Sequence, residues 1–149
     1  MKAVIQRVDC AGVSVNSAVI GEIGRGLIVY LGVEKGDTRG DADYLLDKII
    51  NLRIFEDSSG KMNLSLMDTG GQILVISQFT LLADCRKGRR PSFASAEDPG
   101  PAKELYEYFV SMAQGKAGGV QTGEFQAMMK INSVNDGPVT IIIDSKRQQ

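Results

Sequence analysis

The chain has 149 residues, of which 43% are hydrophobic and 23% charged, with a formal net charge of −1, two cysteines and no histidine. Length and composition predict one ordinary domain over residues 1–149, and no apolar run reaches the roughly 20 residues that a membrane span needs. The lack of imidazole excludes a Ser-His-Asp triad, a Cys-His pair and histidine-based metal sites, and Cys10 and Cys85 fit no zinc-ligand spacing. The N-terminal MKAVIQRVDC resembles no export signal, so we expect a soluble protein in the cytoplasm.

Strands are predicted first along the chain, followed by a helix. From Val4 to Ile23, apolar residues alternate with polar ones on both sides of Asn16-Ser17, which is the pattern of an antiparallel hairpin. Residues 26–33 form a continuous apolar run between glycines, which is typical of a central strand covered on both faces. A helix of about three turns is predicted next. A capping-box pair, Thr38 and Asp41, precedes apolar residues at helical spacing: Ala42, Leu45, Leu46, Ile49 and Ile50.

The rest of the chain is predicted to alternate strands with one charged loop and a second helix. A short strand at 54–55 is followed by a turn, and a second buried strand is predicted over 72–82. After the charged loop at 84–91, an amphipathic helix begins near Asp98-Pro99 and has these apolar residues: Ala102, Leu105, Tyr106, Phe109 and Ala113. The chain ends in strands, and 139–143 is their last apolar run. An alternating face precedes that run: Phe125, Ala127, Met129 and Ile131.

These elements predict the fold class. Strands outnumber helices, and local hairpins combine with helical crossovers. We therefore expect a single layered α/β domain with a mixed, largely antiparallel sheet and two main helices.

Two segments have polar residues that could support chemistry. Ser77-Gln78-Phe79-Thr80-Leu81 interrupts an apolar strand where burial favours Val, Ile or Leu. From the residues alone, Ser77 and Thr80 could equally form hydrogen bonds within the sheet while Gln78 faces solvent. Asn135-Asp136-Gly137-Pro138-Val139-Thr140 has the composition of a plain turn before a final strand. Its Gly-Pro bond could also be cis and present two carbonyl groups rigidly.

A third segment is basic, with four cations around Gly88: Arg86, Lys87, Arg89 and Arg90. Such a cluster is stable either when solvated or when matched to phosphate groups, and the residues alone leave both interpretations open. Because the net charge is −1, a nucleic-acid partner would have to be held by a local patch of this kind. Cys85 beside these cations could be a nucleophile, but the chain offers no histidine to activate it.

The first two motifs together resemble those of the D-aminoacyl-tRNA deacylase family, formerly described through D-tyrosyl-tRNA. Both motifs are intact, and the similarity extends over almost the whole chain. Further segments that resemble the family are Ile5-Gln6-Arg7-Val8, Leu31-Gly32-Val33, Arg53-Ile54-Phe55, Gly60-Lys61-Met62-Asn63, Arg90-Pro91-Ser92-Phe93 and Gln121-Thr122-Gly123. The family is identified on this combination of segments.

The resemblance implies a homodimer in which Gly137 and Pro138 of one chain, joined by a cis peptide bond, enter the pocket of the other chain. Their carbonyl groups engage the α-ammonium group of the substrate and exclude an L side chain, whereas D-amino acids and glycine place a hydrogen there. Phe125 and Met129 are the implied wall of the pocket. The implied catalytic segment consists of Ser77, Gln78, Phe79 and Thr80. The implied substrate is the 3′ end of aminoacylated tRNA, without a metal or organic cofactor and without a membrane. With tRNA as the partner, we expect contacts to its phosphates from the basic loop, namely from Arg86, Lys87, Arg89 and Arg90.

The implied reaction is hydrolysis of a carboxylic ester. We expect catalysis assisted by the vicinal ribose 2′-OH of the substrate, with the main-chain N–H groups of Phe79 and Thr80 stabilising the oxyanion. Thr80 as a covalent nucleophile is the competing mechanism, although no base is evident beside it. A different class of function, a non-catalytic RNA-binding module that uses the loop from Arg86 to Arg90, stays open.

Overall fold

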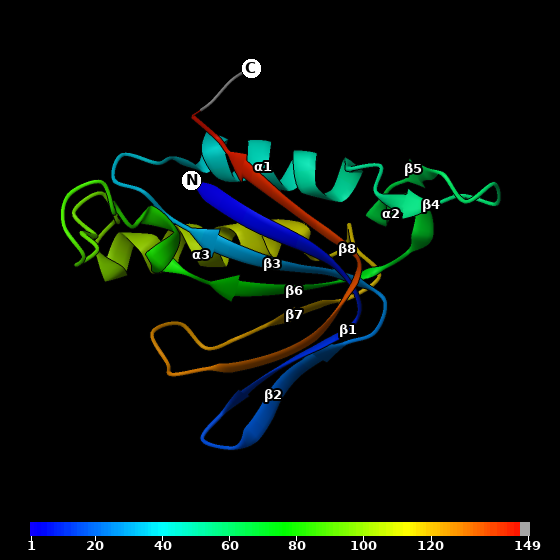
Figure 1. The fold of residues 1–149 in the computed structure, drawn as a ribbon, viewed down its shortest axis with the longest axis horizontal. Helices are drawn as coiled ribbons and strands as arrows, with labels where there is room; N and C mark the ends of the chain where they lie inside the picture. Colours follow the sequence, from blue (N-terminus) through cyan, green and yellow to red (C-terminus); the bar gives the residue numbers. More distant parts are fainter. Residues whose placement is uncertain (147–149) are drawn as a thin grey trace.

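The structure, a computed structural model, describes residues 1–146, so the end of the polar tail at 147–149 lies outside the described part. A six-stranded sheet is the centre of the fold, and its main helices lie on one face (Figure 1). The strands are β1 (Lys2–Val15), β2 (Ala18–Ile23), β3 (Gly26–Gly32), β6 (Gln72–Ser77), β7 (Val120–Thr122) and β8 (Lys130–Asp144). The predicted mixed α/β fold is confirmed.

The long strand β1 organises the sheet. One edge of β1 pairs antiparallel with β3 over residues 2–8 and with β2 over residues 11–15, and its other edge pairs antiparallel with β8. Beyond β3, the strands β6 and β7 continue the sheet in parallel. Asn16 and Ser17 have positive φ angles of 49° and 64° in the predicted hairpin turn between β1 and β2, and β3 is central, as its apolar run predicts.

The two predicted helices are α1 (Arg39–Asn51) and α3 (Pro99–Ala113). The predicted capping pair is present at α1, where the Thr38 amide donates to Asp41 Oδ2 over 2.8 Å. α3 has Pro99 in its first turn, where a missing N–H costs little. Both helices pack on the side chains of one sheet face, and the Tyr106 hydroxyl of α3 donates to the Val75 carbonyl of β6 over 2.8 Å. Within residues 1–146, no helix is long and apolar enough to cross a membrane.

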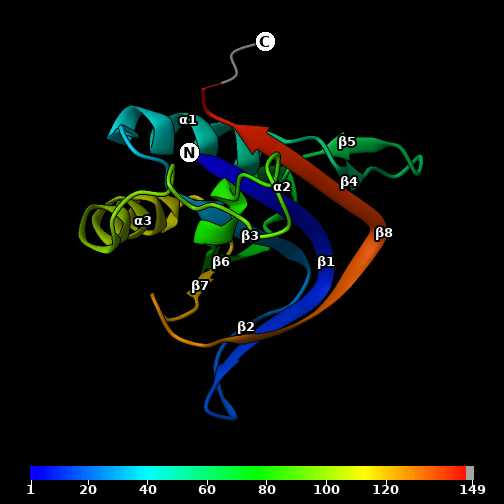
Figure 2. The ribbon, with the colours of Figure 1, turned by 60° about the vertical axis from the view of Figure 1, so that its left-hand side comes forward.

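The opposite face of the sheet is partly curled on itself. Figure 2 shows β1 and β8 bending together along their length. Inside the bend, seven buried residues form a second apolar cluster: Val8, Ala11, Val13, Ile23, Ile28, Leu74 and Ile76. This face continues beyond the cluster, where Val4 is in register with Tyr30 of β3, which packs against the cluster, and with Ile142 of β8. We call this part, defined by Val4, Tyr30 and Ile142, the open face; Ile142 is 75% exposed there.

Three predictions about elements are wrong in part. The strand predicted over 72–82 ends at Ser77, because Phe79–Leu82 forms a 3-10 helix, η1. The alternation from Phe125 to Met129 lies in turn and irregular structure before β8. The turn predicted at 135–138 does not precede a separate strand. These residues form an irregularity inside β8, and β8 pairs with β1 before and after them.

Three short elements after α1 complete the structure. β4 (Phe55–Glu56) is the strand predicted at 54–55, and it pairs with β5 (Met62–Leu64). The helix α2 (Leu66–Thr69) follows, with its own capping box between Ser65 and Asp68. α2 was not predicted because four residues are too few to show helical periodicity.

Candidate active site

The segment Ser77 to Leu82 leaves the sheet at the end of β6. The Gln78 amide still donates to the Leu31 carbonyl of β3 over 2.8 Å, and the chain then turns into η1. Gln78 Nε2 donates to Thr80 Oγ1, so the two polar side chains contact each other beyond the sheet. Phe79 is 59% exposed and Thr80 is exposed as well. The polar residues of this motif therefore form a small accessible surface.

Gly32, at the end of β3, is the residue against which η1 packs. This glycine is two residues from Tyr30 on β3, so a side chain at this position would point toward the open face. A Cβ atom there would lie 2.5 Å from Leu82 Cδ2, 3.0 Å from the Gln78 carbonyl oxygen and 3.2 Å from Leu81 Cβ. The missing side chain thus allows η1 to cross directly over the end of β3, which places Phe79 and Thr80 on the same side of the sheet as the open face.

The second motif, at Gly137 and Pro138, is fixed to β1. The peptide bond between the two residues is cis, and Gly137 has a φ angle of +116°. Asn135 Nδ2 donates to the Arg7 and Val139 carbonyl groups over 3.0 and 3.1 Å. Arg7 itself is buried, and its guanidinium donates to the Ile54 carbonyl over 2.6 Å and pairs with Asp136 over 3.0 Å. Gly137 and Pro138 are both exposed, while the preceding Asn135 and Asp136 are fixed by hydrogen bonds and by the ion pair with Arg7.

Arg7 supports this region, although it is not among the predicted site residues. It follows Ala3 and Ile5 in the inward phase of β1, where the alternation calls for an apolar side chain. A charged residue in that phase is the signal by which Arg7 could have been found, since buried charges require partners.

One chain does not bring the two motifs together. Ser77 is in register with Leu31, Leu31 with Ala3, and Ala3 with Ile143, whereas Gly137 and Pro138 lie opposite Arg7. The motifs are therefore separated by three strand spacings of about 4.8 Å and by four residues of about 3.3 Å each, a distance on the order of 20 Å.

Phe125 and Met129 lie near β6 but on different faces of the sheet. The Phe125 ring packs against Tyr106 of α3, with ring centroids 5.9 Å apart, on the helix side. Met129 packs against the second apolar cluster and touches Gly123 at the end of β7. Their alternation in sequence predicted one shared face. The structure separates them because residues 123–129 are not a strand.

The chain matches known proteins over nearly its full length. The family model described as D-Tyr-tRNA(Tyr) deacylase matches residues 4–144. The D-aminoacyl-tRNA deacylase of Syntrophus aciditrophicus is 60% identical over 147 residues, which cover 99% of each chain. The chain belongs to the D-aminoacyl-tRNA deacylase family. A D-aminoacyl-tRNA deacylase of Thermosipho melanesiensis is 57% identical over 148 residues, with 99% of each chain covered.

Two solved structures share the fold of this chain. The c-Myc DNA Unwinding Element Binding Protein superposes with a TM-score of 0.91 at 41% identity, covering 97% of this chain and 98% of that chain. A probable eukaryotic D-amino acid tRNA deacylase superposes with a TM-score of 0.79 at 18% identity, covering 95% and 97%, which shows a shared fold.

In this member of the deacylase family, the basic loop has an internal ion pair. Arg86 donates to both oxygens of the Asp84 carboxylate, over 2.9 and 2.7 Å, and these bonds hold the pKa of Asp84 far below its usual range. Lys87, Arg89 and Arg90 are exposed and form no ion pair with any residue from 1 to 146. Cys85 is an exposed free thiol.

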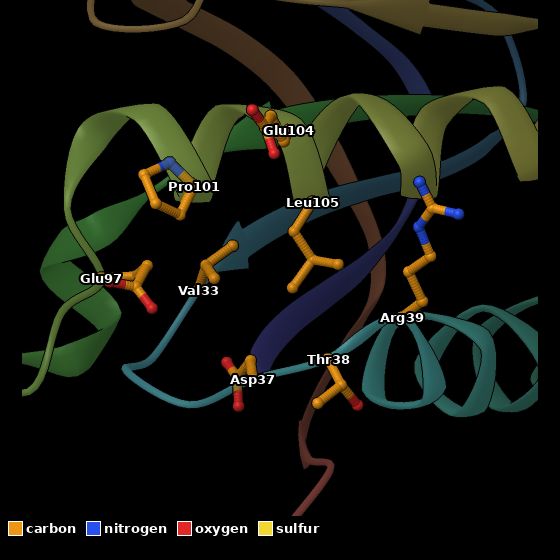
Figure 3. A pocket seen from close by; sticks show the side chains of 8 residues that line it. All are labelled: Val33, Asp37, Thr38, Arg39, Glu97, Pro101, Glu104 and Leu105. Atoms are coloured by element: carbon orange, nitrogen blue, oxygen red, sulfur yellow. The ribbon is translucent and has the colours of Figure 1, made fainter.

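Two cavities in the described part of this deacylase chain lie away from the predicted site residues. One cavity, of about 260 Å³, lies between the N-terminal ends of α1 and α3, and Figure 3 shows the residues that line it, among them Val33, Arg39 and Leu105. A second, of about 530 Å³, follows β1, β2 and β8 from Cys10 to Val134. Residues 77–80 and 137–138 line neither cavity, so one chain presents them as separate surfaces.

Proposed function

We propose that the protein hydrolyses the ester bond of D-aminoacyl-tRNA, releasing the D-amino acid and tRNA, in a homodimer whose two sites are each built from both chains. Glycyl-tRNA is also a substrate in this proposal, and L-aminoacyl-tRNA is rejected. The observation that carries the shared site is the separation, on the order of 20 Å, between Gly137-Pro138 and Ser77 in one chain. A second copy is needed to place one motif beside the other.

The geometry of the sheet supports face-to-face association. A two-fold axis in the plane of the interface that bisects the line between Ser77 and Gly137 places each Gly137-Pro138 over the Ser77 to Thr80 segment of the other chain. The middle of that line falls on β1 and β3, close to Val4 and Tyr30 of the open face. Ile142 and Val4 offer apolar surface there, and association would remove it from water.

The Gly137-Pro138 surface supports chiral selection in the proposed site. Its exposed carbonyl groups are suited to accept hydrogen bonds from an α-ammonium group. With the ammonium group held there, the substituents on Cα have fixed directions, and an L side chain would point into the motif. A D-amino acid or glycine places a hydrogen in that direction, so rejection rests on a steric clash.

The amides at the start of η1 support the proposed chemistry. The first N–H groups of a helix have no acceptor within it, and in η1 these belong to Phe79 and Thr80. Aimed at the scissile carbonyl, they would stabilise the negative oxygen of the tetrahedral intermediate. The substrate's 2′-OH would transfer the proton from an attacking water and assist departure of the 3′ oxygen. Thr80 Oγ1 accepts a hydrogen bond from Gln78 Nε2. An amide donor cannot remove the hydroxyl proton, so this contact does not activate Thr80 as a nucleophile.

Direct hydrolysis assays test the function. The purified protein is incubated with D-tyrosyl-tRNA, L-tyrosyl-tRNA and glycyl-tRNA, and released amino acid is measured. We expect rapid release from the D and glycyl substrates and only the spontaneous rate from the L substrate. Binding of tRNA without any release would instead support the non-catalytic RNA-binding module suggested by the basic loop.

The role of the ribose hydroxyl is tested with D-tyrosyl-tRNA that ends in 2′-deoxyadenosine. A positioned proton-transfer group contributes about 10²–10⁴-fold to a rate, so single-turnover hydrolysis should slow by that order while binding changes little. An unchanged rate on the deoxy substrate would contradict substrate assistance and favour the competing mechanism, in which Thr80 is the nucleophile.

A further inference from the structure

Two aromatic side chains next to the proposed catalytic segment are exposed. Phe79 is 59% and Phe93 37% exposed, whereas Phe55 and Phe109 are fully buried. The two exposed rings meet edge to face, with centroids 5.1 Å apart and an interplanar angle of 68°. Rings of this size are usually buried, so an exposed pair marks a contact surface.

The pair is held in place by the backbone around it. Asp84 and Ser92 close the basic loop through two main-chain hydrogen bonds of 2.8 and 3.0 Å. Past the loop, Ser95 Oγ donates to the Leu82 carbonyl at the end of η1 over 3.1 Å. Phe93 is thus tied to the element that contains Phe79, across the basic loop that separates them in the chain.

The cations of the loop fall into two classes. Arg86 is bound in two places by Asp84, so its charge is matched inside the loop. Lys87, Arg89 and Arg90 are exposed, and within residues 1–146 they have no acidic partner. The loop next to the ring pair therefore presents three unmatched positive charges, which complement a polyanion.

We propose that Phe79 and Phe93 form a stacking platform for unpaired bases at the tRNA 3′ end, with phosphate contacts from Lys87, Arg89 and Arg90. Arg86 has a different task in this arrangement, because with Asp84 it shapes the loop. Exposed rings beside free cations suit single-stranded RNA, since unpaired bases offer their faces while duplex bases do not. This inference rests on the proposed function, which brings the 3′ end to Thr80.

The test compares binding of uncharged tRNA that has its unpaired 3′ nucleotides with binding of the same tRNA lacking the last three. Phe93→Leu keeps apolar bulk and loses the ring, and Phe93→Tyr, the matched control, keeps the ring. Stacking supports a loss of about fivefold or more in affinity for Phe93→Leu with the complete tRNA, and no loss with the shortened one. Phe93→Tyr should bind both RNAs like the wild type.

The cation assignment is tested by the salt dependence of the same binding. Arg89→Gln should lower the slope of log K against log salt by about 0.7, the value for one single-strand phosphate contact. Arg86→Gln should leave the slope unchanged. A lower slope for Arg86→Gln, or an unchanged slope for Arg89→Gln, would overturn the division between the two classes.

A second measurement does not depend on variants that fold. In tRNA with 2-aminopurine in place of the terminal adenine, or a fluorescent cytosine analogue in place of either preceding cytosine, wild-type protein should quench at least one label through stacking. Unquenched labels, or equal losses by Phe93→Leu with both RNAs, would refute the platform. A change of oligomeric state in Phe93→Leu with unchanged RNA binding would also refute it, because the rings would then be covered by a second copy.

The proposed function is read separately from D-tyrosyl-tRNA hydrolysis by the wild type. If the wild type hydrolyses D-tyrosyl-tRNA but RNA binding does not depend on Phe93, the stacking platform is refuted and the proposed function is supported. If binding depends on Phe93 and on the 3′ nucleotides but no hydrolysis occurs, the platform is supported and the proposed function is refuted.

Discussion

At the scale of single residues, small changes in volume or charge position the two motifs. Gly32 contributes no side chain, and η1 occupies the space that a side chain would need. Arg7 contributes a buried guanidinium, which joins the Ile54 carbonyl to Asp136 next to Gly137. Neither Gly32 nor Arg7 is a proposed catalytic residue. Gly32 positions the backbone of η1, and Arg7 positions the backbone next to Gly137.

Gly32→Ala tests this role of Gly32. The added methyl group would lie 2.5 Å from Leu82 Cδ2 and 3.0 Å from the Gln78 carbonyl oxygen, so we expect a loss of about 1–3 kcal/mol in the free energy of unfolding. Hydrolysis of D-tyrosyl-tRNA should fall further than stability explains, because Phe79 and Thr80 move with η1. Gly40→Ala is the control, because a Cβ there has its nearest contact at 3.5 Å, and it should leave activity unchanged. Wild-type activity in Gly32→Ala would contradict the assignment.

At the scale of elements, the start of α1 is joined to the end of β8. Ser145 Oγ donates to Asp41 Oδ1 over 2.7 Å, and the Ser145 amide donates to the Met1 carbonyl over 2.9 Å. The Asp41 carboxylate also caps α1 through Thr38. Burial acts to raise the pKa of Asp41, but the hydrogen bonds from Ser145 and Thr38 outweigh it, and the pKa is lowered. One ionised carboxylate therefore joins the helix layer to the edge strand.

The pH dependence of stability follows from that direction. Since folding lowers the pKa of Asp41, its contribution is complete above the unfolded value, about 3.9, and is lost as pH falls through the lower folded value. Asp41→Asn should be less stable than the wild type at pH 7, with a smaller difference at pH 3, in urea unfolding followed by circular dichroism. A stability difference that is the same at both pH values would show that ionisation of Asp41 contributes nothing.

At the scale of the whole molecule, the order of the strands decides what one chain can do alone. β8 lies on the far edge of β1, and β6 lies two strands from β1 on the other side. The Gly137-Pro138 surface and the Ser77 to Thr80 surface are consequently apart in each chain. Two copies related by a two-fold axis would complete two equal sites, and the homodimer is part of our proposal for this reason.

A mixed dimer tests the shared site. One chain carries Thr80→Trp, which blocks the Ser77 to Thr80 surface. The other carries Gly137→Val, which is strained at a φ of +116° and places Cβ 3.0 Å from the Val139 amide nitrogen. Each variant alone should be inactive. Purified with two different tags, the mixed dimer has one site with both surfaces intact, so about half of the wild-type activity on D-tyrosyl-tRNA should return. If the mixed dimer, folded and of one-to-one composition, stays inactive, the site is not shared.

The sequence by itself determined the local elements of this protein. The hairpin around Asn16-Ser17, the central strand at 26–33 and the two main helices are visible because hydrophobic periodicity and capping pairs act within a few residues. The two motifs that resemble the deacylase family are also local strings, so the family could be identified from them. Even the buried phase of Arg7 is present in the alternation of β1.

Only the tertiary structure decided how these parts meet. The sequence from Phe79 to Leu82 is apolar enough for a buried strand. It forms η1 instead, because it packs against Gly32 of another strand, β3. Phe125 and Met129 alternate like strand residues and yet lie on different faces of the sheet. The gap between the two motifs follows from strand order. Each of these outcomes depends on contacts between residues remote in the chain, and periodicity within a segment contains no information about which remote surface will cover it.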